Sequence, residues 1–392
     1  MASIVLGVVL TFASTDGKSL ALDVTLSQTA TVSVELEGSV LRATSTSTAP
    51  FPSLSFGPFA SPERDLVARI RVAGEAPLTA VVPARRRGLR VAVYGDTRDG
   101  DAPHRILAEA IRSARPDVVV HTGDLIRTSN DDAGFARFLN ALWPGPVGSD
   151  AGRLVPLVVA LGNHEVLGPG EGVERLLASV PVPADALARS VGVPPTVFHV
   201  TYGPMRFVSI DSNVSLAVGT PQYRYLESLL DRADGSKLTL VAMHHGPTSS
   251  GVHGAHPDGA ALMELFRRKR VSMVAAGHDH LYERIVADGV TYLVSGGGGA
   301  PLYWRASYAT GSVAFAPVHH FVLLDVGEDG SVSLEARALE GSVLDRASWK
   351  GAPSDPSARK GLPWAPLAGL FIMLVVMGYV AKRILFRPSP GG

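Results

Sequence analysis

The sequence contains no cysteine among its 392 residues. This absence excludes thiolate nucleophiles, zinc sites with thiolate ligands and disulfide-stabilised scaffolds. Apolar residues make up 46% of the chain, so a chain of this length can bury a sizeable core without covalent cross-links. The chemistry of the protein therefore has to come from oxygen and nitrogen donors.

The chain also lacks net charge, because 36 basic residues balance 36 acidic ones. A protein that binds a nucleic-acid backbone needs an excess of basic side chains to neutralise the phosphates. We therefore expect no nucleic-acid partner. A small phosphorylated substrate remains compatible with the composition, since its recognition needs only local charge.

Long apolar runs are scarce, and the most pronounced one lies near the carboxyl end. Residues 362–381 form an uncharged stretch of 20 residues. At about 1.5 Å per residue, such a helix spans the roughly 30 Å of a bilayer core. We expect a transmembrane helix at 362–383, preceded by a polar stalk at 340–361 and followed by a short tail at 384–392. A buried core helix is the alternative interpretation.

The predicted span makes the protein a single-pass membrane protein whose sidedness the sequence leaves open. We expect the catalytic part to be exported to the periplasm or the cell exterior, and a tail-anchored enzyme in the cytoplasm is the alternative. Residues 4–13 are apolar, but no Lys or Arg precedes them. We therefore interpret them as a first β-strand in preference to a signal peptide.

The amino-terminal region and the region after it have different patterns. Residues 1–87 contain short runs rich in Val, Leu and Thr, separated by turn residues, which predicts a small all-β sandwich of fibronectin type III form. From residue 89 onward, strand-like runs alternate with helical patterns, such as those at 223–230 and 260–266, which predicts an α/β fold. Residues 321–325 and 331–336 are predicted to form a closing hairpin.

Five apolar, β-branched runs in the α/β region each end at a group of metal-ligating residue types. Ligand sites of open α/β sheets lie at the carboxyl ends of strands, and glycine beside a ligand leaves room for a metal or phosphate oxygen. Carboxylate, amide oxygen and imidazole together suit iron, manganese or zinc. The groups, in chain order, are Gly95-Asp96, Gly123-Asp124, Gly162-Asn163-His164-Glu165, Met243-His244-His245 and Gly277-His278-Asp279-His280.

This order of motifs resembles that of the calcineurin-like metallophosphoesterases over about residues 89–299. The run Tyr282-Glu283-Arg284, the glycines at 296–299 and the amino-terminal β-sandwich resemble the purple acid phosphatase branch. The resemblance implies a four-layer α/β sandwich at 88–339, with two mixed sheets flanked by helices. It also implies a two-metal phosphoester hydrolase in which metal-bound hydroxide attacks a phosphomonoester or a diester.

The resemblance assigns roles to individual residues. It implies that Asp124 bridges two metals and that His164 faces the phosphate as leaving-group acid or electrostatic stabiliser. His245 is expected to have a secondary role, because a continuing strand would point it to the opposite face. The six metal ligands implied are Asp96, Asp124, Asn163, His244, His278 and His280, with Asp96 and His280 on one metal and Asn163, His244 and His278 on the other.

Two positions depart from the family pattern. Arg98 stands where the family often has a histidine ligand, and Arg127 stands where purple acid phosphatases have a tyrosine. The missing ligand of the first metal could be replaced by His104, by water or by nothing. Arg98 is a poor metal ligand because it is permanently cationic, but it is a candidate contact for a phosphate oxygen.

Two other functions and the roles of three further histidines stay open. A receptor-like or structural membrane protein with a degenerate metal centre and a binding β-sandwich is one alternative, and the two arginine departures motivate it. A nucleotide or cyclic-nucleotide phosphodiesterase is another. His253 and His256, in a polar loop after His244, are candidates for substrate contact, whereas His121 is expected to be packed inside a strand.

Overall fold

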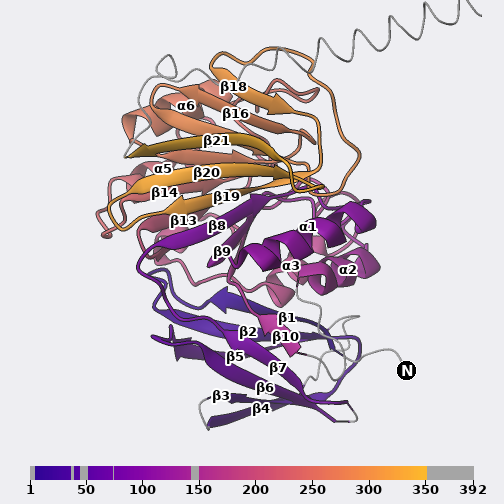
Figure 1. Ribbon diagram of the computed structural model, residues 1–392. Coiled ribbons are helices and arrows are strands. Elements are labelled where there is room, and N and C mark those ends of the chain that lie inside the picture. Colours follow the sequence, from indigo (N-terminus) through magenta and orange to yellow (C-terminus); the bar gives the residue numbers. More distant parts are fainter. Residues whose placement is uncertain (1–4, 37–38, 45–51, 74, 143–149, 351–392) are drawn as a thin grey trace, which may run out of the picture. The chain divides into compact units, whose positions relative to one another are not determined.

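The computed structural model of the protein describes residues 5–36, 39–44, 52–73, 75–142 and 150–350 (Figure 1). Within these ranges, no helix has the length and apolarity needed to cross a bilayer. The predicted transmembrane helix at 362–383, the tail at 384–392 and the second half of the predicted stalk lie outside the described residues.

The amino-terminal region forms two β-sheets, as the sequence predicts. One sheet has the strand order β1-β2-β5 and the other has the order β10-β7-β6-β3-β4. Their bounds are β1 Val5–Phe12, β2 Ser19–Leu26, β3 Thr31–Leu36, β4 Ser39–Thr44, β5 Ser53–Ala60, β6 Leu66–Val72, β7 Leu78–Val82 and β10 Asp150–Arg153. In β6, buried and exposed residues alternate along the whole strand, as expected when one face of a sheet covers a core.

The sandwich is joined to the α/β region by a shared strand and a shared core. Strand β10 comes from far beyond residue 87, yet it pairs in parallel with β7. On the other sheet, Leu10 forms a bridge with Pro156, and a Cβ atom added at Gly7 would lie 2.8 Å from the Leu139 side chain. Residues 1–87 therefore supply most of the sandwich but not all of it.

The α/β region contains two mixed sheets flanked by helices. The six-stranded sheet has the order β11-β9-β8-β19-β20-β21, and the seven-stranded sheet has the order β12-β13-β14-β15-β17-β16-β18. The first sheet comprises β8 Leu89–Tyr94, β9 Val118–His121, β11 Leu157–Val159, β19 His320–Val326, β20 Ser331–Ala338 and β21 Val343–Lys350. The second comprises β12 Phe198–Tyr202, β13 Met205–Ser209, β14 Leu238–Ala242, β15 Met273–Ala276, β16 Tyr282–Ala287, β17 Val290–Ser295 and β18 Ser312–Ala316.

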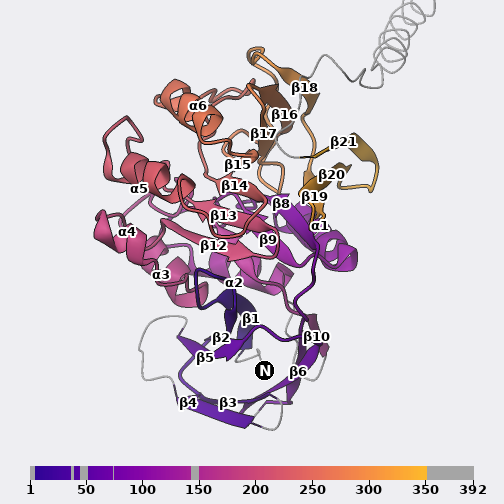
Figure 2. The same cartoon turned by 90° about the vertical axis from the view of Figure 1, so that its left-hand side faces the viewer.

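Helices cover both sheets. The helices are α1 Asp101–Ala114, α2 Asp132–Leu142, α3 Gly172–Ser179, α4 Ala186–Ser190, α5 Pro221–Leu230 and α6 Gly259–Arg268. Leu107 of α1 and Phe135 of α2 share a hydrophobic core with β8 and β9. Leu226 of α5 and Leu262 of α6 share a second core with β13, β14 and β15. Figure 2 shows α5 and α6 beside the seven-stranded sheet. This arrangement of layers, the helices near 223–230 and 260–266 and the hairpin of β19 and β20 agree with the sequence-based predictions.

One expectation about the domain bounds fails within the described residues. Positions 343–350, which the sequence suggested as part of a polar stalk, form β21 at the edge of the six-stranded sheet. Asp345 of this strand accepts hydrogen bonds from the Tyr282 hydroxyl at 2.7 Å and from Arg284 Nε at 2.6 Å. The α/β region therefore extends about one strand beyond residue 339.

Candidate metal centre

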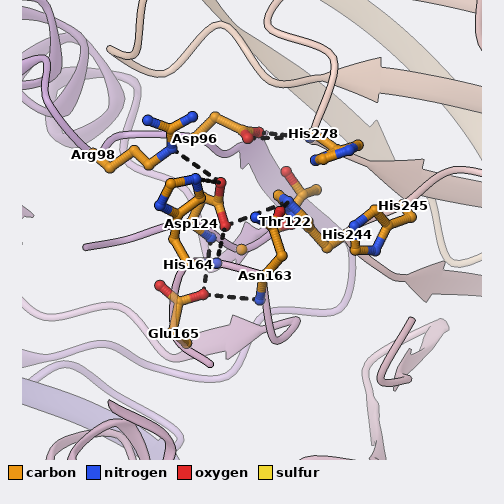
Figure 3. Close-up of polar contacts among 12 residues, drawn as sticks. Asp96, Arg98, Thr122, Asp124, Asn163, His164, Glu165, His244, His245 and His278 are labelled. Carbon is orange, nitrogen blue, oxygen red and sulfur yellow. Dashed lines mark hydrogen bonds and ion pairs between the residues drawn. The ribbon is translucent and has the colours of Figure 1, made fainter. Parts of the chain in front are cut away.

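The predicted ligands gather where strands of the two sheets end. Strands β8, β9 and β11 are mutually parallel neighbours, and so are β14 and β15, so each group of carboxyl ends lies at one edge of its sheet. Asp96, Asp124 and Asn163 follow strands of the first group, and His244 and His278 follow strands of the second. Figure 3 shows these side chains converging on one another.

Three predicted ligands have a backbone conformation that L-residues rarely adopt. The φ angle is 59° at Asp96 and at Asp124 and 67° at His278. Seven non-glycine residues in the described ranges have positive φ, so almost half of them are predicted ligands. Such backbone conformations cost on the order of 1–3 kcal/mol each and concentrate at functional sites, where surrounding contacts enforce them.

Hydrogen bonds and glycines enforce these conformations. The Asp96 N–H donates to the Gly123 carbonyl at 3.0 Å, and the His278 N–H donates to the Asp96 carboxylate at 3.1 Å. A Cβ atom added at Gly277 would lie 2.3 Å from Asp96 Oδ2, and one added at Gly95 would lie 1.9 Å from a Thr122 side-chain oxygen. The glycines before the ligands are therefore needed for close approach, as the sequence-based interpretation proposed.

Both oxygens of the buried Asp124 carboxylate have partners among the predicted site residues. Oδ1 accepts the His164 N–H at 3.0 Å and lies 3.4 Å from His244 Nε2. Oδ2 accepts a hydrogen bond from Arg98 Nε at 3.1 Å and lies 3.7 Å from His164 Nε2. Both oxygens of this buried carboxylate therefore face side chains of the predicted site.

Backbone carbonyls orient two of the imidazoles. His244 Nδ1 lies 2.9 Å from the Thr122 carbonyl, and His280 Nδ1 lies 2.6 Å from the Pro301 carbonyl. Because a carbonyl oxygen can only accept, each Nδ1 carries the proton and each Nε2 faces the site. His280 Nε2 lies 3.4 Å from Asp96 Oδ1. Fixing Nδ1 in this way is how proteins prepare histidines for metal ligation.

The contact between His244 and Asn163 indicates whether these side chains could bind a metal cation. His244 Nε2 lies 2.9 Å from Asn163 Oδ1. With Nδ1 already donating, Nε2 can bond to this oxygen only in the imidazolium form. Burial opposes that form, but the carboxylates of Asp124 and Asp96 raise the pKa of His244 above its ordinary value. The imidazole nitrogen and the amide oxygen meet beside two carboxylates, so a metal cation fits the residues present.

His245 lies closer to this cluster than the sequence suggested. Its ring centroid is 4.3 Å from that of His278, and ligand atoms of His244, His245 and His278 all lie within 4.8 Å of one another. Its Nδ1 lies 3.0 Å from the Ser212 hydroxyl. The expectation of an opposite face is wrong because β14 ends at Ala242, so strand alternation does not extend to residues 244 and 245.

Arg98 and Arg127 differ in exposure and in role. The Arg98 side chain is 14% exposed and pairs with both Asp124 and Asp99, its bond to Asp99 measuring 2.7 Å. The Arg127 side chain is 69% exposed, and it is the Arg127 carbonyl that lies 2.5 Å from His164 Nδ1. His164 is thereby oriented with Nε2 toward the site.

The structure does not bring His104 to the ligands. His104 lies on the buried face of α1, with its ring stacked on Phe138 at 5.5 Å and its Nε2 3.2 Å from the Tyr94 hydroxyl. Burial lowers the pKa of His104 to about 3. The suggestion that His104 replaces the missing ligand is therefore not supported. His121 is packed as expected, its Nδ1 accepting the Gly123 N–H at 3.2 Å.

The two loop histidines after His244 separate in the structure. The His253 ring lies 4.1 Å from the His278 ring, so His253 borders the centre. His256 instead accepts the Asp258 N–H through Nδ1 at 3.0 Å, and its ring is 6.4 Å from that of His245. A substrate contact is therefore better placed at His253.

The role of Glu165, a buried carboxylate that binds the backbone around the site, was not evident from the sequence. Glu165 accepts four backbone N–H groups, from Asp124 and Gly162 on Oε2 and from Leu125 and Ile126 on Oε1. Its position next to His164 was visible, but no feature of the sequence distinguishes a carboxylate that binds backbone from one that binds metal.

Comparison with known proteins agrees with this geometry. Residues 89–282 match the family model of the calcineurin-like phosphoesterases. These residues form a calcineurin-like phosphoesterase domain. The purple acid phosphatase PPD1 of yellow lupin (Lupinus luteus) has the same fold, with a TM-score of 0.72 at 19% identity over 93% of this chain and 78% of that one.

Two curated relatives each match about half of the chain. A barley (Hordeum vulgare) protein named nucleotide pyrophosphatase/phosphodiesterase is 28% identical over 50% of this chain and 60% of its own length. An Arabidopsis thaliana protein named probable inactive purple acid phosphatase 1 is 27% identical over 48% of this chain and 35% of its own length. The match thus spans less than two thirds of either relative.

Proposed function

We propose that the protein is a metal-dependent phosphoester hydrolase that acts on a small phosphomonoester or diester through two metal ions, each iron, manganese or zinc. The observation that carries the proposal is the convergence of Asp96, Asp124 and His244, whose ligand atoms lie within 4.8 Å of one another and are buried. When bound, a pair of metal ions supplies a nucleophile from water at neutral pH and balances charge on the phosphoryl oxygens.

The chain's own residues divide the remaining tasks. Asp124 would bridge the metals, with Asp96 and His280 completing one position. Asn163, His244 and His278 would complete the other, a combination supported by the 2.9 Å contact between His244 and Asn163.

His164 and Arg98 would act on the substrate. His164 keeps Nδ1 on the Arg127 carbonyl and directs Nε2 toward the Asp124 carboxylate, so it would protonate or stabilise the leaving oxygen. Arg98, fixed by Asp99 and Asp124, would contact a phosphate oxygen.

The decisive experiment combines turnover with metal content. The purified protein would be loaded in turn with manganese, iron and zinc and assayed on an aryl phosphate and a bis-aryl phosphate. Asp124→Asn should abolish turnover and lower the metal content, whereas Glu63→Gln, at an exposed carboxylate, should change neither. A folded protein that hydrolyses neither ester with any metal would overturn the proposal.

Two observations favour a second candidate, a receptor-like or structural protein with a degenerate metal centre. The permanently charged Arg98 is paired with the carboxylate assigned to bridge the metals, and one relative is named as a probable inactive phosphatase. Elemental analysis separates the candidates, because two metals per chain support the hydrolase and fewer than one supports the degenerate centre.

We further propose that residues 362–383 anchor the protein in a membrane with the phosphoesterase domain exported. The support is the uncharged run at 362–381. Protease added to intact cells should remove the domain. Protection of the domain would instead indicate a cytoplasmic tail-anchored protein.

A further inference from the structure

The segment that follows the glycine run, residues 300–309, is attached directly to two predicted metal ligands. The Ala300 N–H donates to the Asp96 carbonyl at 2.8 Å, and the Tyr303 N–H donates to the His280 carbonyl at 3.0 Å. In return, His280 Nδ1 donates to the Pro301 carbonyl at 2.6 Å. The beginning of this segment therefore has a fixed position relative to the metal centre.

The other half of the segment is fixed to a neighbouring loop. The Ala306 and Ser307 N–H groups both donate to the Ser250 carbonyl, at 2.8 and 3.0 Å, and the Ala309 N–H donates to the Ser250 hydroxyl at 2.8 Å. Ser250 is itself held by the buried carboxylate of Glu283 at 2.7 and 2.5 Å. The backbone of the segment is thus organised before any ligand binds.

This fixed backbone carries three aromatic side chains. The Tyr303 ring stacks on the His280 ring at 4.1 Å and 13°, and it also contacts the His253 ring at 5.2 Å. Trp304 and Tyr308 are 77% and 82% exposed, the highest values among the large apolar side chains of the described ranges. Exposed aromatic side chains on a well-anchored segment forgo the free energy of burial, so they are available to a ligand.

Arg305 adds positive charge to the same surface. Its guanidinium lies 4.6 Å from the Tyr308 ring centroid and 4.0 Å from that of Phe315. Stacking holds the planar group in place while its N–H groups remain along the edge. Aromatic faces next to a fixed guanidinium suit a ligand that is itself flat, aromatic and anionic.

We propose that residues 303–308 form the leaving-group subsite of the enzyme and that the subsite accepts a flat aromatic group, such as the base of a nucleoside phosphate. The inference rests on the proposed function. In hydrolysis, a water oxygen forms a bond to phosphorus, the bond from phosphorus to the leaving oxygen breaks, and that oxygen takes up a proton. With the phosphoryl group at the metal ligands, a leaving group that extends past His280 and Tyr303 would meet the segment that carries Trp304 and Arg305.

The test compares adenosine 5′-monophosphate with ribose 5-phosphate, which differ only by the base. Stacking of one base contributes about 1–3 kcal/mol, so Trp304→Ala should raise KM for the nucleotide by roughly 5- to 150-fold. KM for ribose 5-phosphate should change less than about twofold by the same reasoning. Trp304→Phe should retain most of the nucleotide affinity, and Val40→Ala, at an exposed residue of the amino-terminal sheet, should change neither substrate.

A binding measurement gives an answer without turnover. The nucleotide should quench tryptophan fluorescence saturably in the wild-type protein, ribose 5-phosphate should not, and the quench should disappear in Trp304→Phe. Equal KM changes for both substrates, or a quench that persists in Trp304→Phe, would overturn the subsite. If the wild-type protein hydrolysed neither substrate, the proposed function would be contradicted. The fluorescence titration would still show whether the subsite binds the nucleotide.

Discussion

Replacing Glu165 with glutamine is the sharpest test of how the centre is held together. In the native protein each oxygen of this buried carboxylate accepts two backbone N–H groups. Glutamine keeps one oxygen and replaces the other with an NH₂ group, which can only donate. Two backbone N–H groups would then face a donor in place of an acceptor.

The magnitude follows from those two groups. A buried N–H without a partner costs about 1–3 kcal/mol, so Glu165→Gln should lower the free energy of unfolding by about 2–6 kcal/mol. If the NH₂ group takes the place of Oε2, the two N–H groups that lose their acceptor are those of Asp124 and Gly162. Because Asp124 is held at a φ of 59°, loss of this bond should displace its carboxylate as well.

Urea unfolding of the metal-free protein measures the first effect, and elemental analysis after metal loading measures the second. Glu63→Gln is the matched control, since Glu63 is exposed, and its free energy of unfolding should change by less than about 0.5 kcal/mol. A Glu165→Gln variant that is as stable as the control and binds the same amount of metal would refute the reasoning.

Four further changes have defined outcomes. His164→Ala should lower kcat by about 10²–10⁴-fold with unchanged metal content by elemental analysis. Arg98→Ala should raise KM without emptying the metal site, and unchanged kinetics at saturating metal would contradict its phosphate contact. Burial raises the pKa of Asp23 from 3.8 to about 6, so the contribution of Asp23 to stability falls as pH rises through that value. Above pH 6, Asp23→Asn should therefore be more stable than the wild type by about 1–3 kcal/mol, as measured by urea unfolding. Asp345→Ala should lose about 1.5–3 kcal/mol of unfolding free energy, because Arg284 loses its partner, and a loss below this range would show that β21 is held by other contacts.

The order of strands and ligands was predictable because it depends on local features of the sequence. Apolar β-branched runs identify strands, and the residue types after them identify candidate donors, so Asp96, Asp124 and His278 could be proposed as ligands without knowledge of their neighbours. The left-handed backbone at these residues was not predictable, because nothing in the identity of an aspartate or histidine indicates it.

Apart from the expected stalk at 343–350, which forms β21, the errors concern which way a side chain faces. His104 lies at the spacing of the buried face of α1, with Leu107, Ala108 and Ile111 following at three, four and seven residues. That pattern was available in the sequence, and it favours a packed histidine over a ligand. The placement of His245, in contrast, depended on where β14 ends, and strand ends are set by tertiary contacts.

The run Tyr282-Glu283-Arg284 shows why some roles emerge only in three dimensions. In strand β16, alternation sends Tyr282 and Arg284 to one side and Glu283 to the other. The first two reach Asp345 on β21, which belongs to the other sheet, and so connect the two sheets. Glu283 instead fixes Ser250, to which the aromatic segment at 300–309 is bonded. The run Tyr282-Glu283-Arg284, which in the sequence served only to suggest a family, therefore couples the packing of the two sheets to the segment at 300–309. A change at Glu283 should alter the preference for the leaving group, whereas a change at Arg284 should lower the stability of the protein.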